Sequence, residues 1–483
     1  MVPFGEYKPD LADYEGKATK NIVNAVPQGD GYAPAFDFSV LTSALHGPCL
    51  GSFYALKSDG SVSIFAGTST GLYKLNNIDQ TWANISVVYP AVPNNRNWSF
   101  EQFNNLVIAV QGNIVPQVYD LSASTYFADL GGSPPQANYA RVVGRFLVLS
   151  GLTDNPTRIQ WSGLNDVTQW APGVNSSDYQ DLPDGGLVGP IAGGEQSAII
   201  FQDNALRRMN YAPGSAVIFQ IQRITQEMGL FAPYSVVRSG EKVFFYSAKG
   251  FYVIEPGGLP VPIGRERVDR TFFADLDKSS LHYFVGASDP RSSKVFWAYK
   301  SVSGSVGQHD KIIGYDHALD RWFTINMRGQ FLLGMSQPGL TLEGLDAFFA
   351  SIDAMDSSLD SFALSTTPEI SQFDTSNRLG FFRGATLEAT LETAEQGNNG
   401  GHIFVRGFRP ITDANSIFGS ASYRETLRAT ATAGAESAMN TRTGKCEMRR
   451  STRYSRLKVR IPAGAQWTYC AGVEPDIVAE GDQ

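Results

Sequence analysis

Residues 63–82, SIFAGTSTGLYKLNNIDQTW, decide the fold because their plan recurs along the first two-thirds of the chain. An apolar run leads to a second strand-like segment with an aromatic residue, and then through a polar turn to Trp82. Comparable apolar runs, SIFAG, LVIAVQG, FLVLSG, AIIFQD, VFFYSA and VFWAY, begin at residues 63, 106, 146, 198, 243 and 295. Repeats of roughly 40 to 50 residues with four short strands each are typical of β-propeller blades. We predict about six four-stranded blades over residues 46–328, with residues 1–45 as an N-terminal extension that takes part in closing the propeller. A β-sandwich stays open as an alternative.

The composition supports a mostly β chain. Its 483 residues include 48 Gly, 25 Pro, 30 Phe and 20 Tyr, which suits short strands and frequent turns. No run of 18 apolar residues exists, and the N-terminus lacks the basic and apolar regions of a secretory signal. Three cysteines are too few for a disulfide framework, so we expect folding in a reducing cytoplasm. A net charge of −8 argues against a general nucleic-acid binder.

The polar turn of the first repeat carries Asp79, Thr81 and Trp82. It resembles a degraded Asp-box, the turn of sialidase-like propellers in which the Asp caps the turn and the Trp packs between strands. The resemblance implies a structural role and does not imply glycosidase activity.

Residues 376–483 have a different sequence pattern, without the repeated apolar runs of the preceding part. Apolar Leu387, Ala389 and Leu391 alternate with polar residues, which predicts half-buried strands in a smaller antiparallel β domain. From residue 442 to residue 460 there are eight basic residues against one acid, Glu447. We take the following as a candidate protein-docking or DNA-facing basic face: Arg449, Arg450, Arg453, Arg456, Lys458 and Arg460. A solvated outer face explains the same pattern.

Residues 329–375 are expected to form a junction. Within them, EGLDAFFASIDAMDSSLDSF (343–362) places Asp346, Asp353 and Asp360 seven residues apart. That spread is too wide for one calcium loop. The apolar residues recur at steps of three and four, which predicts a packing seam on a short helix or on three successive turns: Leu345, Phe348, Ile352, Met355, Leu359 and Phe362.

The sequence contains no recognisable catalytic or cofactor motif. None of the five histidines lies in HExxH or at metal-ligand spacing, and no phosphate-binding loop or GxSxG follows a strand. We therefore predict no catalytic residues, no metal site and no cofactor, and we expect a protein that is not an enzyme.

The order of several segments along the chain carries a family resemblance. They run from about residue 4 to 382, and RYSRLKVRIPAGAQW (453–467) adds a less specific match. The segments are FGEYKPDLADYEGKATKNIVNAVPQGDGYAP, FAGTSTGLYKL, NPTRIQWSGLNDVTQW, DYQDLPDGG, AIIFQDNALRRMNY, PIGRERVDRTFFADLD, EGLDAFFASIDAMDSSLDSF and FDTSNRLGFFRG. In this series the chain is similar to the β-propeller tail nozzle and hub proteins of short-tailed bacteriophages.

The resemblance implies a structural virion protein in the phage tail, assembled in the host cytoplasm. It implies a homohexameric ring around a DNA-ejection channel used in host cell entry, with the adaptor or head-to-tail connector above and a fibre, spike or needle below. It implies no catalytic residues and no stable membrane insertion. A net negative wall would let DNA pass without sticking, since attraction to phosphates grows with the number of Lys and Arg contacts.

Two other functions remain open. One is a carbohydrate-binding or glycan-cleaving propeller at the tail tip, acting in receptor binding. The other is a cytoplasmic interaction scaffold.

Overall fold

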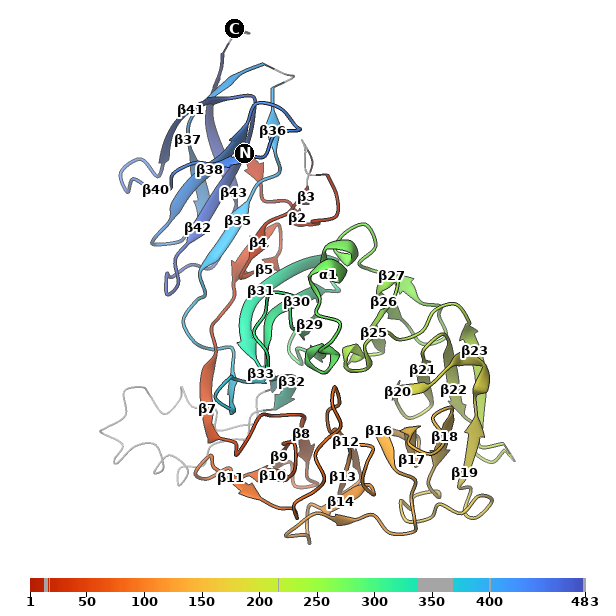
Figure 1. The fold of residues 1–483 in the computed structure, drawn as a ribbon. Helices are drawn as coiled ribbons and strands as arrows, with labels where there is room; N and C mark the ends of the chain where they lie inside the picture. Colours follow the sequence, from red (N-terminus) through yellow and green to blue (C-terminus); the bar gives the residue numbers. More distant parts are fainter. Residues whose placement is uncertain (13–15, 17, 216, 337–367, 399–400, 481–483) are drawn as a thin grey trace.

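The computed structural model describes residues 1–12, 16, 18–215, 217–336, 368–398 and 401–480. Almost all elements in this part of the chain are strands, in many four-stranded antiparallel sheets, so the predicted mostly β class is confirmed (Figure 1). The helical elements here are α1 (Asp269–Asp275) and three 3₁₀ turns, η1 (Pro183–Gly185), η2 (Pro233–Ser235) and η3 (Leu281–Tyr283). None of the described helices is long and apolar enough to cross a membrane.

Five sheets consist of four successive antiparallel strands each. Their strands are β8 (Ser52–Leu56), β9 (Val62–Gly67), β10 (Leu72–Leu75) and β11 (Trp82–Asn84); β12 (Ser99–Phe103), β13 (Leu106–Val110), β14 (Gln117–Asp120) and β15 (Ala128–Asp129); β16 (Ala137–Val143), β17 (Phe146–Leu152), β18 (Arg158–Trp161) and β19 (Asp178–Asp181); β20 (Val188–Gly193), β21 (Ser197–Gln202), β22 (Leu206–Tyr211) and β23 (Phe219–Thr225); β24 (Val237–Ser239), β25 (Lys242–Ser247), β26 (Gly250–Ile254) and β27 (Val261–Pro262).

Two further groups of four strands follow. The first, β28 (Val285–Ser288), β29 (Lys294–Tyr299), β30 (His309–Asp316) and β31 (Arg321–Gly329), belongs to a larger sheet. The second pairs β32 (Phe331–Ser336), β33 (Pro368–Phe373) and β34 (Arg378–Phe381) with β7 (Ser39–Ala44) from the N-terminal segment.

The six apolar runs form the second strand of their groups, as their continuous hydrophobicity predicts for strands covered on both faces. Every residue of β9 and β17 is buried. Between neighbouring sheets the side chains form shared cores; one of these joins Phe65 and Leu72 of the first group to Val107 and Tyr119 of the second.

The seven groups are arranged in a ring, here called the ring (Figure 1). The first strands of neighbouring groups contact each other in the pairs β8–β12, β12–β16 and β16–β20. The turn η2 contacts both β20 and β28. The pairs β24–β28 and β28–β32 continue the series. Contact between β32 and β8 completes the circuit. Over the described residues the topology thus has seven groups of four strands, where the sequence predicted about six. The additional group was missed because its hairpin β32–β33 is interrupted by residues 337–367, which breaks the repeat interval.

The predicted turn-capping residues act as such. The Asp79 carboxylate accepts hydrogen bonds from the Thr81 backbone N–H at 3.1 Å and hydroxyl at 2.7 Å. Trp82 is buried in a core shared with Phe373 of the neighbouring group. Asp166 caps the corresponding turn of the third group in the same way, through Thr168. The motif is therefore structural in this chain.

Two further sheets enclose one core and form the C-terminal module. One contains β41 (Cys446–Thr452), β37 (Ile403–Thr412), β43 (Cys470–Ala479), β6 (Gly31–Pro34) and β5 (Ala25–Gln28), with β1 (Val2–Pro3) on β43. The other contains β4 (Ile22–Val23), β35 (Ala389–Glu392), β42 (Tyr454–Ile461), β38 (Phe418–Arg424) and β39 (Thr432–Ala433), with β36 (Gln396–Gly397) on β42 and β40 (Ser437–Ala438) on β38. A short parallel pair, β2 (Glu6–Tyr7) and β3 (Ala18–Thr19), precedes them.

The N-terminal segment is shared between the ring and the C-terminal module. β7 pairs with β34 in the ring, whereas β1, β4, β5 and β6 pair with strands of the module. β4 also pairs with β31, so one sheet runs from β28 in the ring to β39 in the module. The predicted boundary at residue 328 falls inside β31, and the predicted junction 329–375 contains β32 and β33. The division into domains itself stays a prediction.

Candidate functional site

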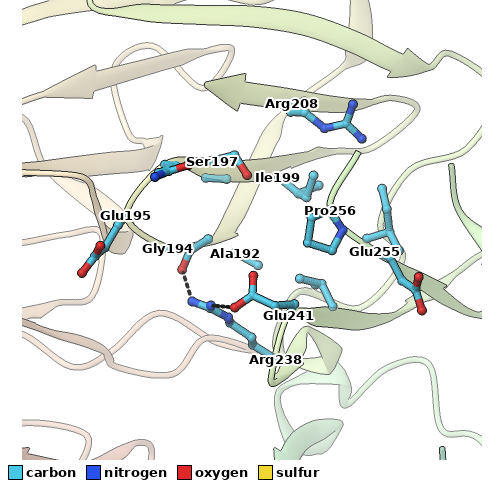
Figure 2. A pocket seen from close by; sticks show the side chains of 15 residues that line it. Ala192, Gly194, Glu195, Ser197, Ile199, Arg208, Arg238, Glu241, Glu255 and Pro256 are labelled. Carbon is cyan, nitrogen blue, oxygen red and sulfur yellow. Dashed lines mark hydrogen bonds and ion pairs between the residues drawn. The ribbon is translucent and has the colours of Figure 1, made fainter. Parts of the chain in front are cut away.

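Two cavities flank the turn of residues 193–197, which joins β20 to β21. The first, drawn in Figure 2, has a volume of about 540 Å³ and lies between the fourth and fifth groups of the ring. The second, of about 750 Å³, lies toward the β16–β17 turn of the third group. Both are lined by Glu195, Gln196 and Ser197. The tip of one hairpin therefore separates two hollows.

Arg238 of β24 holds this turn in place. Its Nη1 donates to the Gly193 carbonyl at 2.9 Å, its Nε donates to the Gly240 carbonyl at 2.9 Å, and its Nη2 lies 3.2 Å from a carboxylate oxygen of Glu241 (Figure 2). A Cβ on Gly194 would lie 2.9 Å from Arg238 Nη1. A second guanidinium, that of Arg141, donates to the same Gly193 carbonyl at 3.2 Å. A side chain at residue 194 would therefore displace the Arg238 guanidinium from its present position.

Arg208 and Glu255 complete the polar rim of the first cavity. The Arg208 Nη2 donates to the Gly258 carbonyl at 2.8 Å, and Lys242 lies 3.0 Å from a carboxylate oxygen of Glu255. Buried Ala198, Ile199, Val243 and Ile254 also line this cavity. The arrangement offers directed hydrogen bonds over an apolar base.

Tyr211 lines the second cavity with Arg145 and Asn210. The Tyr211 ring packs against Phe146 and Phe219, with ring centroids 5.7 Å and 5.8 Å away. At Gly144, which has a φ of 60°, a Cβ would lie 3.0 Å from Tyr211 Cδ1. These contacts set the orientation of a half-buried aromatic ring beside the hollow.

The predicted basic face is divided between two sheets. On β42 the predicted alternation is present: Leu457 and Val459 are buried in the core, and Arg456, Lys458 and Arg460 point to the other side. Arg449 and Arg450 belong to β41 in the opposite sheet, and Arg453 lies in the connection between the two strands. The six residues therefore come from two sheets and the connection between them, and Arg450 of β41 lies over the Tyr423 ring of β38.

Carboxylates accompany the basic residues of β42. Arg460 lies 2.9 Å from Glu388 and 2.8 Å from Glu436, and its guanidinium lowers the pKa of Glu436 below the ordinary value. Lys458 stands opposite Glu392 of β35 in the strand register. The outer side of β42 is consequently a surface of mixed charge.

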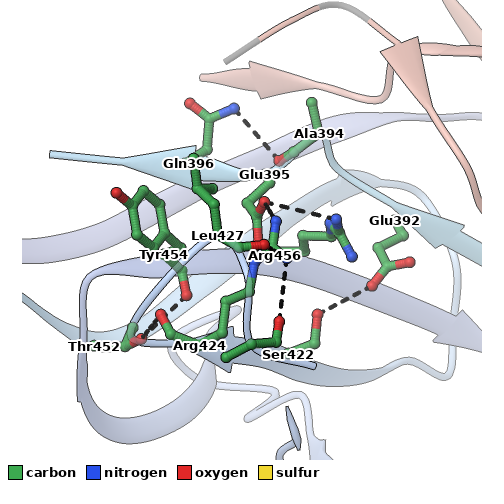
Figure 3. Close-up of polar contacts among 11 residues, drawn as sticks. Glu392, Ala394, Glu395, Gln396, Ser422, Arg424, Leu427, Thr452, Tyr454 and Arg456 are labelled. Atoms are coloured by element: carbon green, nitrogen blue, oxygen red, sulfur yellow. Dashed lines mark hydrogen bonds and ion pairs between the residues drawn. The ribbon is translucent and has the colours of Figure 1, made fainter. Parts of the chain in front are cut away.

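Arg456 turns toward a carboxylate in the interior, Glu395, which is 1% exposed (Figure 3). Arg424 of β38 forks onto the same carboxylate, with Nε donating at 2.7 Å. Nη1 of Arg424 also donates to the carbonyls of Leu427 and Ala429 at 2.6 Å and 3.2 Å. The cluster ties β38, β42 and the loop after β35 together. Sequence reasoning missed Glu395 because no spacing relates it to its arginines.

The predicted packing seam (Leu345, Phe348, Ile352, Met355, Leu359 and Phe362) lies outside the described residues, as do Asp346, Asp353 and Asp360. Within the described ranges, no group of three or more His, Cys, Asp or Glu residues could hold a metal ion.

The loop between β11 and β12 reaches elements on the inner side of the ring. The Asn97 backbone N–H donates to the Tyr234 hydroxyl of η2 at 2.8 Å, and the Asn97 amide donates to the His282 carbonyl of η3 at 2.8 Å. Beside it, Arg96 donates to the Tyr139 hydroxyl at 2.8 Å, and burial raises the pKa of both tyrosines. Three distant segments of the ring thus meet in one polar cluster.

The chain matches no family model and no curated protein. Among solved structures, it is similar to a functionally unknown protein from Desulfotomaculum acetoxidans at 11% identity, with a TM-score of 0.38, over 60% of this chain and 89% of that one. It is also similar to BamB from Moraxella catarrhalis at 12% identity, with a TM-score of 0.35, over 65% of this chain and 88% of that one. Likenesses this weak carry no argument about function.

Proposed function

We propose that this chain is a structural virion protein, the tail nozzle or hub of a short-tailed phage, and that six copies form part of the DNA-ejection channel below the adaptor. The ordered series of segments that resembles such tail proteins, spanning about residues 4 to 382, suggests this role. In the same proposal the seven groups are the blades of a seven-bladed β-propeller, and β7 closes the last blade by pairing with β34.

The observation that carries the proposal is the sheet that continues from β28 in the ring to β39 in the C-terminal module. A channel subunit has to keep its shape while DNA moves past it. A main-chain ladder through β31, β4 and β35 supports such rigidity, because bending between the two parts would break its hydrogen bonds.

The proposal also restricts the DNA path. Asn97, Tyr234 and His282 join segments on the inner side of the ring, so we place the channel between subunits and not through one propeller. The outer side of β42 suits a wall that does not hold DNA, since Arg460 is already engaged by Glu388 and Glu436. The charge part of this proposal fails if β42 lines the narrowest constriction with its basic residues free of carboxylates.

Negative-stain microscopy of the purified chain tests the proposal. Sixfold rings, alone or added to isolated adaptor rings, are the expected result. A chain that remains monomeric in the presence of adaptor rings contradicts it.

A second candidate function, carbohydrate binding at the tail tip, is favoured by one observation, the pair of polar cavities beside the 193–197 turn.

A further inference from the structure

The two cavities lie on either side of the hairpin tip at residues 193–197 and are together called the trough below. Glu195, Gln196 and Ser197 line both of them, so a ligand that spans the hairpin tip can contact both cavities. Their volumes of about 540 Å³ and 750 Å³ each fall in the usual range of small-ligand sites. The lining comes from the third, fourth and fifth groups of the ring. An elongated ligand therefore fits the trough better than a compact one.

The charge of the trough is balanced. Its lining includes three arginines and three glutamates: Arg145, Arg208, Arg238, Glu195, Glu241 and Glu255. Arg238 and Glu241 already face each other (Figure 2). A site for nucleic acid or another polyanion would need an excess of cations. The balance indicates a ligand without net charge.

The polar groups of the lining are of both hydrogen-bonding kinds. The amides of Gln196 and Asn210 and the hydroxyl of Ser197 can donate and accept, whereas the Glu195 carboxylate accepts. Glu195 and Gln196 at the hairpin tip are exposed. Hydroxyl groups on a ligand can satisfy both kinds of partner at once.

The second cavity also has an aromatic surface. Tyr211 is held by Phe146 and Phe219 and by the close approach of Gly144. Because its neighbours set its orientation, binding does not have to order this ring. The ring combines an apolar body with a polar tip, which suits a ligand whose rings have apolar C–H faces and hydroxyl rims.

We propose that the trough binds a neutral oligosaccharide. Tyr211 stacks on one sugar ring in the larger cavity, Gln196 and Glu195 bond hydroxyls at the hairpin tip, and Arg208 and Glu241 bond a further sugar in the smaller cavity. This inference rests on the second candidate function, carbohydrate binding, and specifies its ligand. It does not depend on the structural role, because a single chain contains the whole trough.

Isothermal titration calorimetry of the full chain tests the proposal with maltohexaose, cellohexaose and chitohexaose, and with heparin as the polyanion. We expect saturable binding of at least one neutral hexasaccharide and no binding of heparin. Tyr211→Ala should weaken that binding by about tenfold or more, which corresponds to about 1.4 kcal/mol. Tyr211→Phe keeps the stacking ring and should stay within about twofold.

Tyr126→Ala is the matched control, since Tyr126 is 61% exposed, sits between β14 and β15, and lies outside the trough lining. The Tyr126→Ala variant should bind the hexasaccharide with the same affinity as the native chain. Gln196→Ala and Glu241→Gln alter exposed side chains, so they test the trough even if Tyr211→Ala fails to fold. Each should weaken binding by about threefold or more. The proposal is overturned if none of the three sugars shows binding at sugar concentrations up to about 10 mM, which would place every Kd above the millimolar range. It is also overturned if Tyr126→Ala weakens binding as much as Tyr211→Ala, or if heparin binds more tightly than the sugars.

Discussion

Replacement of Glu395 by glutamine should loosen the C-terminal module and leave the ring intact. The Glu395 carboxylate is almost completely buried, and the guanidinium groups of Arg424 and Arg456 converge on it (Figure 3). Glutamine has nearly the same shape but no charge. The substitution therefore leaves two cationic groups with much less compensation in a poorly hydrated place.

The magnitude follows from the burial of the three side chains. Breaking a buried ion pair by removing one partner typically costs about 3–5 kcal/mol. The arginine side chains are 17% and 19% exposed, so water recovers part of that loss. We expect a loss of about 3 kcal/mol in the opening free energy of the module, which corresponds to roughly 150-fold faster exchange of its most protected amides.

Hydrogen exchange measured by mass spectrometry can read this change by segment. Peptides covering β38 and β42 report on the module, and peptides covering β17, whose residues are all buried in the ring, serve as an internal reference. Glu436→Gln is the matched control: Glu436 also binds an arginine, Arg460, but its side chain is 36% exposed. It should cost no more than about 1 kcal/mol.

Two results would refute this reasoning. One is an acceleration of less than about fivefold in β38 and β42 for Glu395→Gln, which would mean that the cluster is screened like a surface pair. The other is an equal effect of Glu395→Gln and Glu436→Gln, because burial would then not decide the cost.

Two further substitutions test other parts of the structure. Asn97→Ala removes the amide that donates to the His282 carbonyl and should lower the free energy of unfolding, measured by chemical denaturation, by about 1–3 kcal/mol. The control Asn94→Ala, at an exposed position of the same loop, should change it by less than about 0.5 kcal/mol. Equal effects of the two substitutions would contradict a role for the polar cluster. Burial, together with the nearby Asp10, raises the pKa of Asp269 from 3.8 to about 6, so the folded protein holds this proton more tightly than the unfolded chain does. Ionisation of Asp269 therefore lowers the free energy of unfolding as the pH rises from about 4 through about 6. Over this interval the melting temperature of Asp269→Asn should rise relative to that of the native chain. A difference that is independent of pH would contradict the prediction.

The apolar runs predicted the second strand of six groups because burial on both faces leaves a signal that is local in sequence. β9 and β17 are completely buried and are continuous apolar runs. The seventh group has no such signal. Its first two strands stand on either side of residues 337–367, and its fourth strand, β7, comes from near the other end of the chain.

The basic residues of β42 show the same limit of prediction from sequence: their orientation was predictable, and their acidic partners were not. Alternation along β42 is a property of eight consecutive residues, so the buried and outward sides were predictable. The acids that engage Arg460 stand 24 and 72 positions away, and only the pairing of strands brings them to it. The sequence could not predict the trough for a similar reason, because its lining extends from Gly144 to Pro256 and contains no local motif.

The strand order also links the ring to the C-terminal module. β4 lies between β31 of the ring and β35 of the module, and it pairs with both. A rotation of the module against the ring must break one of these pairings or stretch the chain that leads from β4 through β5 and β6 to β7. Within that connection β6 is held on β43, and its far end, β7, is held on β34. A load applied to the module is therefore transmitted to the ring through main-chain hydrogen bonds, which is the property that the proposed role in a channel wall requires.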